Sequence, residues 1–261
     1  MIGLLYFGVI LITCILAAIV GLGGGVFFRP IFDAIGYHDF NNIQFLSSCA
    51  IIVMAVVSTI KKVKDGTKID MRLAASVSFG SILGGLVGDW VLEYLQVVMS
   101  SEQNVQLIQT ISTIIVLSVA IFLTLRKSFR YETTNKFVPP LIGFALGLTA
   151  VYLGIGGGPL NVPLFMIFLG MATKDATAYS IVVIFFTHAA RLVRLGITTD
   201  FFTGFDLGIL PVVAVAAAIG GLLGAKFSKL LSDATVKKMF IGSLIVVIML
   251  NMFNGIQWIN S

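Results

Sequence analysis

Long apolar stretches alternate with short polar segments along almost the entire chain. Most of the stretches approach the ~20 residues that an α-helix needs to cross a bilayer, and they lack the polar alternation of membrane strands. The pattern therefore predicts an all-α polytopic membrane protein with about eight transmembrane helices. We expect the first stretch to be a retained helix rather than a cleaved signal peptide. The apolar stretches cover residues 2–20, 43–60, 73–92, 107–125, 141–153, 163–171, 176–195, 207–225 and 239–253.

The composition supports a membrane protein and excludes several other classes. Hydrophobic residues make up 58% and charged residues 11% of the chain, and the mean hydropathy is +1.04, which is too apolar for a soluble protein of 261 residues. The net charge of +5 comes from short clusters between apolar stretches, which favours orientation by the positive-inside rule over nucleic-acid binding. Cys14 and Cys49 both lie in apolar stretches, so we expect neither a disulfide nor a metal site, and no cofactor.

A glycine-rich element occurs twice. Gly21-Leu22-Gly23-Gly24-Gly25, with Pro30 after it, returns 133 positions later as Gly154-Ile155-Gly156-Gly157-Gly158, with Pro163 after it. A second repeated glycine pattern relates residues 84–88 to residues 220–224, and we expect these glycines to permit close helix packing. The chain is therefore predicted to be one membrane domain over residues 1–261, with repeat 1 at 1–125, a linker at 126–138 and repeat 2 at 139–261. The second set of glycines is Gly84, Gly85 and Gly88, matched by Gly220, Gly221 and Gly224.

The charges between the apolar stretches predict that the two halves are inverted. Residues 61–72, the linker and residues 226–238 each carry a net charge of +3, whereas residues 191–206 sum to zero. The positive-inside rule then places the three basic segments on the cytoplasmic side. The equivalent segments 61–72 and 191–206 lie on opposite sides, which is typical of the inverted repeats of secondary transporters.

The lengths of the stretches predict broken, re-entrant hairpins at the glycine elements. Residues 141–153 reach roughly 20 Å as a helix, against a hydrocarbon core of about 30 Å, so this helix should stop inside the membrane. Residues 2–20 are long enough to cross, which weakens the parallel in the first half. If a short helix begins near Pro30 and another near Pro163, free amides and helix dipoles from both hairpins would form an anion site near the midplane. The alternative is that these glycines only permit tight helix packing.

Several polar residues within apolar stretches are candidates for substrate binding. His188 and Arg191 share a helix face with Thr187 and Arg194, and His188 is suited to proton coupling; the alternative is that the arginines reach the interface and His188 bonds a neighbouring helix. Arg29 is expected either to contact substrate or to pair with Asp33, and Asn161 either to donate to an oxyanion or to bond local backbone. The candidate substrate-binding residues are Gly23, Gly24, Gly25, Arg29, Ser48, Gly156, Gly157, Gly158, Asn161, His188 and Arg191.

The paired Gly-x-Gly-Gly-Gly-x4-Pro elements, the Ala176-Thr177-Ala178-Tyr179-Ser180 segment and the two-half organisation resemble the TauE/SafE family of sulfite exporters. The resemblance covers nearly the whole chain. It implies a multi-pass carrier in the inner membrane of a bacterium or archaeon, for small sulfur-containing anions such as sulfite or sulfonates. The chain departs from the usual small or apolar residues of the first element at Phe27, Phe28 and Arg29.

These observations predict a secondary transporter that moves a small, sulfur-containing anion by alternating access. Its partners would be that anion, the lipid bilayer and protons as the coupling ion, without nucleic acid, and the sequence does not fix the oligomeric state. Two alternatives remain open at this point, a passive anion channel and a carrier of a non-sulfur organic acid. A membrane enzyme is disfavoured and no catalytic residue is expected, because carboxylates are scarce within the apolar stretches.

Overall fold

The computed structural model describes residues 2–99, 101–126, 135–155, 158–198 and 205–260, and within these ranges every regular element is a helix. The predicted all-α fold is therefore confirmed. The helices are α1 (Ile2–Val20), α2 (Gly25–Ile35), α3 (Phe40–Lys64), α4 (Met71–Val98), α5 (Glu102–Leu125), α6 (Val138–Tyr152), α7 (Asn161–Phe168), α8 (Thr173–Thr198), α10 (Leu210–Leu230) and α11 (Asp233–Asn260).

Seven helices in the described part of the chain are long and apolar enough to cross a membrane, one fewer than the expected number of about eight. The seven are α1, α3, α4, α5, α8, α10 and α11, whereas the apolar helix α6 has only 15 residues. The chain is thus a polytopic membrane protein. Many serine, threonine, asparagine and glutamine side chains are buried within the bundle. Many large apolar side chains are exposed on its outside, as expected for helices in contact with lipid.

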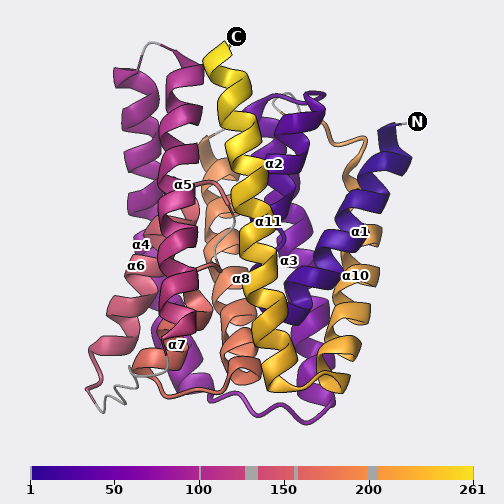
Figure 1. Cartoon of the computed structure of the whole chain (residues 1–261), viewed down its shortest axis with the longest axis vertical. Coiled ribbons are helices and arrows are strands. Elements are labelled where there is room, and N and C mark those ends of the chain that lie inside the picture. Colours follow the sequence, from indigo (N-terminus) through magenta and orange to yellow (C-terminus); the bar gives the residue numbers. More distant parts are fainter. Residues whose placement is uncertain (1, 100, 127–134, 156–157, 199–204, 261) are drawn as a thin grey trace.

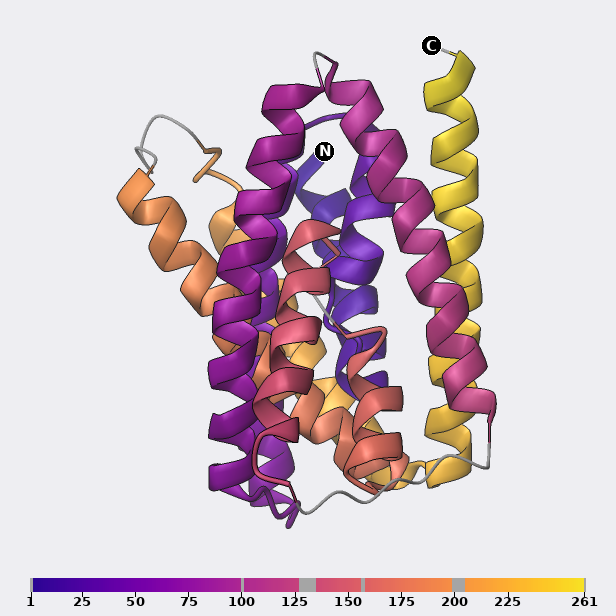
Figure 2. The ribbon, with the colours of Figure 1, turned by 90° about the vertical axis from the view of Figure 1, so that its left-hand side faces the viewer.

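Two helical hairpins enter the bundle from opposite ends (Figure 1). Helix α1 descends from the upper end and α2 returns to that end, whereas α6 rises from the lower end and α7 returns to it (Figures 1 and 2). The re-entrant hairpin predicted from the short length of residues 141–153 is therefore present. The 19 residues of α1 do not lead to the lower face, because the glycine turn reverses the chain and α2 has only 11 residues.

Each hairpin is packed against a helix of the other half through glycines. In the contact of α4 with α6, a Cβ atom on Gly84 would collide with the Phe144 carbonyl, and a Cβ on Gly147 with the Ser81 carbonyl. In the contact of α1 with α10, a Cβ on Gly224 would lie 2.5 Å from the Ile15 carbonyl oxygen. These glycines therefore act in close helix packing, as predicted. Cys14 is buried in the same contact, where its Cβ lies 2.6 Å from the Cβ position of Gly220.

The basic segments gather at one end of the bundle. The α3–α4 and α10–α11 connections lie at the lower end in Figure 1, and the α4–α5 connection and the chain termini at the upper end. By the positive-inside rule we infer that the lower end is cytoplasmic. The division into repeats at 1–125 and 139–261 stays a prediction, and most of the linker, residues 127–134, lies outside the described residues.

Candidate anion site at the hairpin tips

The tips of the two hairpins touch each other inside the bundle. Gly158 adopts a φ of +114°, and a Cβ atom on it would collide with the carbonyl group of Leu22 in the α1–α2 turn. Only glycine combines this backbone conformation with so close an approach. The two hairpin tips were predicted to meet, and in the structure they do so at Leu22 and Gly158. Gly156 and Gly157, which were also predicted to bind substrate, lie outside the described residues.

The first tip presents backbone amides without acceptors. The N–H groups of Gly23, Gly24 and Gly25 are buried and have no hydrogen-bond partner among the described residues. Gly23 and Gly24 precede α2 and Gly25 is its first residue, so all three lie at the end where the helix dipole is positive. A buried amide without an acceptor has an unfavourable free energy of about 1–3 kcal/mol, so this tip favours an anion.

The start of α2 differs from the prediction. The helix was expected to begin near Pro30, but it begins at Gly25, because the carbonyl of Gly24 accepts hydrogen bonds from the N–H groups of Phe27 and Phe28. Pro30 therefore lies inside the helix. In the second hairpin, α7 begins at Asn161 and Pro163 lies in its first turn, as predicted.

Asn161 is engaged close to the first tip. Its Nδ2 donates to Ser180 Oγ at 3.0 Å, and Ser180 Oγ donates to the carbonyl of Gly21 at 2.5 Å. All three residues are buried. The side chain of Asn161 thus bonds Ser180 and not local backbone, which was one of the two roles considered, and it links α7 to α8 and, through Ser180, to the α1–α2 turn. Its role toward an oxyanion stays a prediction.

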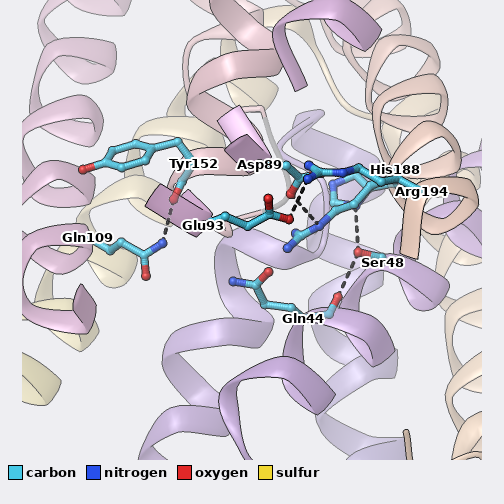
Figure 3. Close-up of polar contacts among 9 residues, drawn as sticks. Gln44, Ser48, Asp89, Glu93, Gln109, Tyr152, His188 and Arg194 are labelled. Carbon is cyan, nitrogen blue, oxygen red and sulfur yellow. Dashed lines mark hydrogen bonds and ion pairs between the residues drawn. The ribbon is translucent and has the colours of Figure 1, made fainter. Parts of the chain in front are cut away.

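Arg29 reaches from the first half to the second hairpin. Its guanidinium donates to the carbonyl of Leu153 and, at 2.6 Å, to Oε1 of Gln109, and its Nε lies 3.6 Å from the Asp33 carboxylate. Gln109 in turn donates to the carbonyl of Tyr152 at 2.6 Å (Figure 3). Together the two side chains satisfy carbonyls at the C-terminus of α6, where a cation is also favoured by the helix dipole.

A second polar cluster lies beside the α6 terminus. His188 Nδ1 is 3.1 Å from Ser48 Oγ, and the Ser48 hydroxyl donates to the Gln44 carbonyl at 2.8 Å (Figure 3). Because the one proton of Ser48 is used in that bond, His188 Nδ1 is the donor to Ser48. The Gln44 amide nitrogen is buried and has no hydrogen-bond partner in the described structure, and the Cβ position of Gly154 lies 2.7 Å from it.

Arg191 and Arg194 follow His188 along α8 and pair with acidic residues of α4. Arg191 Nε lies 3.6 Å from Asp89. Arg194 lies 3.2 Å from Asp89 and 2.6 Å from Glu93 (Figure 3). The side chain of Arg191 is 7% exposed and that of Arg194 is 23% exposed. Arg191 is also close enough to Arg29 for their positive charges to repel each other. Arg191 is therefore the member of this pair that is buried in the protein interior.

The charges of the site balance. The three arginines stand beside Asp33, Asp89 and Glu93. Among the described residues, the buried donors without a hydrogen-bond partner then include the glycine amides, the Gln44 amide nitrogen and Arg191 Nε, whose ion pair with Asp89 is longer than a hydrogen bond. The cavity next to the second tip, lined by Leu153, Gly158 and Asn161 among others, has a volume of about 10 Å³. This is at the lower limit for a single water molecule, so an anion at the tips requires the hairpins to separate.

Sequence reasoning missed the residues that hold the candidates in place. Gln44, Gln109 and Asp89 were not singled out, although each is a polar or charged residue at an apolar stretch and calls for a partner in the membrane. Their contacts link α3, α5 and α4 to the hairpins and to α8. The candidates Arg29, Ser48, His188 and Arg191 lie around the α6 terminus, whereas Asn161 lies beside the first tip.

Helices long enough to span a bilayer, together with two broken hairpins that meet at glycine turns, define a membrane transport protein. The family comparison agrees and is more specific, because residues 6–252 match the family described as Sulfite exporter TauE/SafE. The chain therefore belongs to the TauE/SafE family, which consists of membrane transporters for sulfite-type anions. Comparison with curated proteins and with solved structures gave no match.

Proposed function

We propose that the protein is a secondary transporter that carries a small sulfur-containing oxyanion, such as sulfite or a sulfonate, across the inner membrane by alternating access. One observation carries this proposal beyond the family assignment. Three buried glycine amides without acceptors stand at the tip of one hairpin, and that tip is closed against the other hairpin at Leu22 and Gly158. Such amides bind oxyanions without adding a fixed charge.

The closed contact between the tips supports a carrier rather than a channel. A channel needs a continuous water-filled path, whereas here a backbone carbonyl is packed against a glycine in the centre of the bundle. In a carrier, this contact would open toward one side at a time, as the hairpins move relative to each other. The anion would then bind between the tips while the contact is open.

The surrounding polar residues have distinct roles in this proposal. The Gln44 amide would donate to the anion, His188 and Ser48 would do so after exchanging their present bonds, and Arg191 would stabilise the anion's charge at short range. Arg29 would act mainly by holding the α6 terminus, since its guanidinium is occupied by Leu153, Gln109 and Asp33. His188 is the group suited to couple anion movement to protons, because histidine titrates near neutral pH.

Counterflow in liposomes tests the proposal. Purified protein is reconstituted into vesicles loaded with unlabelled sulfite or ethanesulfonate, and uptake of the labelled anion is followed after dilution. A carrier gives transient accumulation of label above equilibrium, and a channel gives simple equilibration. Formate and acetate at the same ionic strength serve as non-sulfur competitors. Accumulation driven only by these carboxylates would overturn the sulfur specificity, and equilibration without overshoot would overturn the carrier.

Variants of the two neighbouring arginines test the site. Arg191→Ala is expected to lower the transport rate at least about tenfold, as the loss of one charged hydrogen-bonding partner predicts. Arg194→Ala removes the same charge from the same helix at a more exposed position, and we expect a change of less than about threefold. Equal losses in both variants would show that the ion pairs with α4, and not contact with the anion, explain the effect.

A further inference from the structure

A cavity opens among the cytoplasmic ends of α3, α8 and α10, apart from the hairpin tips. Its volume is about 460 Å³, many times that needed for one water molecule. The lining comes from the end of α3 and the α3–α4 connection, from the start of α8 and from the end of α10. The residues around it include Lys62, Thr67, Lys174, Ser228 and Lys229, together with Asp65, Asp175 and Asp233.

Lys62 differs from the other charged residues of this cavity. Its side chain is buried, with the residue 6% exposed, and its ammonium group lies 3.3 Å from Thr177 Oγ1. No carboxylate pairs with Lys62 within the described ranges, and the neighbouring charge that acts on it is that of Lys174, also a cation. A buried ammonium group without a counter-ion is unfavourable, and a bound anion would offset that free energy.

Two acidic residues of the cavity, Asp65 and Asp233, are engaged by groups other than the Lys62 ammonium. The Asp65 carboxylate bonds Lys61 at 2.9 Å and Lys229 at 3.4 Å, and the hydrogen bond with Lys61 holds the pKa of Asp65 below its usual range. Asp233 accepts a hydrogen bond from the Lys174 backbone N–H at 2.8 Å. The Lys174 ammonium donates to the carbonyls of Lys229 and Leu231. Lys62 is thus the buried cation of the cavity whose charge is left uncompensated.

We propose that Lys62 and the cavity that it lines form a binding site for a small oxyanion on the cytoplasmic side of the protein. The ammonium group would bind the anion, while Thr177 accepts one of its hydrogen bonds and donates its own proton to the Lys174 carbonyl at 2.7 Å. The cavity admits hydrated anions from the cytoplasm, which is the side on which the positive-inside rule places it.

The position of Thr177 connects this site to the first hairpin. The Cβ position of Gly21 lies 2.6 Å from Thr177 Cα, so the residue that touches Lys62 also packs against the α1–α2 turn. The cavity site therefore lies directly before the glycine amides on the path from the cytoplasm. This part of the inference rests on the proposed transport function. It assigns the cavity as the first binding site that the anion meets on its way from the cytoplasm.

Charge-selective labelling tests the site without requiring transport. In a chain with Cys14→Ala and Cys49→Ala, the cavity residue Ser228 is replaced by cysteine. Its reaction rates are then measured with the anionic reagent 2-sulfonatoethyl methanethiosulfonate and with the cationic 2-(trimethylammonium)ethyl analogue. We expect Lys62→Met to lower the ratio of anionic to cationic rate about fivefold or more. Lys62→Arg should keep the ratio, and Lys61→Met, which removes a partly exposed and paired cation one residue earlier, should change it less than twofold.

Protection supplies a second measurement. Sulfate or ethanesulfonate is expected to slow the labelling of Ser228→Cys in the parent chain and to lose this effect in Lys62→Met, with chloride at equal ionic strength as the control. An unchanged rate ratio in Lys62→Met, or protection that persists in it, would overturn the site. If Lys62→Met elutes as aggregate on size exclusion, the comparison is made with Lys62→Gln.

Transport measured separately from each side of the membrane distinguishes this inference from the proposed function. In inside-out vesicles, Lys62→Met is expected to raise KM for the anion about fivefold, while KM in right-side-out vesicles changes less than twofold. A lowered labelling ratio without transport of any tested anion would support the cavity site and refute the transport function. Normal counterflow with an unchanged labelling ratio would support the transport function and refute the cavity site.

Discussion

Gly158 of the second hairpin packs against the carbonyl of Leu22 in the first, so that the two glycine turns meet backbone to backbone in the interior of the bundle. Neither residue contributes a functional side chain to this contact. Its importance lies in the fact that any additional atom at position 158 would push the two hairpins apart. The contact is therefore a direct point at which to test whether the closed tips belong to the transport cycle.

Gly158→Ala should disrupt both the transport activity and the stability. The substitution places a Cβ against Leu22 at a φ of +114°, so we expect a loss of more than about 1 kcal/mol of unfolding free energy and at least a tenfold lower counterflow rate. Gly36→Ala is the matched control, since Gly36 also has a positive φ, of +65°, but open space around it. Equal effects of the two substitutions on the melting temperature and on counterflow would remove any special role of the tip contact.

Arg29 should be sensitive to conservative replacement. Lysine cannot serve Leu153, Gln109 and Asp33 together, so Arg29→Lys is expected to lower the melting temperature and the transport rate. Arg29→Met leaves the Asp33 carboxylate buried without its partner, at a cost of about 3–5 kcal/mol. The double variant Arg29→Met with Asp33→Leu should recover much of that stability but not transport, as measured by thermal unfolding and counterflow. Recovery of full transport in the double variant would show that Arg29 has no part in the cycle.

The two hairpins should be accessible from opposite sides of the membrane. Tyr37 and Ala172 are both exposed. Tyr37 follows α2, which ends toward the upper end of the bundle, and Ala172 precedes α8, which begins at the lower end (Figure 1). We expect a membrane-impermeant maleimide to label Tyr37→Cys in intact cells and Ala172→Cys only after permeabilisation. Lys229→Cys should behave like Ala172→Cys. Labelling of Tyr37→Cys and Ala172→Cys from the same side would contradict the opposed hairpins.

The stability should fall below about pH 4 because of Asp206, before α10. A hydrogen bond with His38 at 3.1 Å, and another from the Gly208 N–H, lower the pKa of this carboxyl group. A lowered carboxyl pKa in the folded protein stabilises it above the ordinary value of about 4, and the contribution is lost as the pH falls through the folded-state pKa. Melting temperatures between pH 6 and pH 3 should therefore decline less in Asp206→Asn than in the parent chain. Parallel pH profiles would refute this assignment.

The features that depend on local chain chemistry were predictable from the sequence. Membrane insertion follows from the apolar stretches, and the α6–α7 hairpin follows from the short length of residues 141–153. The glycines of α4 and α10 were correctly expected at close helix contacts. All of these depend on neighbours within one or two helical turns, or on composition.

The features that depend on long-range contacts were not predictable. Arg29 was expected either at the substrate or at Asp33, yet it also binds Leu153, which is 124 positions away. No local pattern identifies Gln109 as its partner, or Lys62 as a cation that pairs with no carboxylate among the described residues. The beginning of α2 at Gly25 was also missed, because proline is favoured in the first turn but is tolerated within a helix when other bonds form the turn.

The glycine contacts between the halves have a consequence for biogenesis. Helix α1 is synthesised first, but α10, whose glycines pack against the α1 backbone, follows some two hundred residues later along the chain. The first hairpin, with its unbonded amides, must therefore remain in the membrane without its partner until the second half has been inserted. We conclude that the contacts that bring the tips together also make each half depend on the other to mature. Truncation within the second half should therefore leave the first half exposed to membrane proteases.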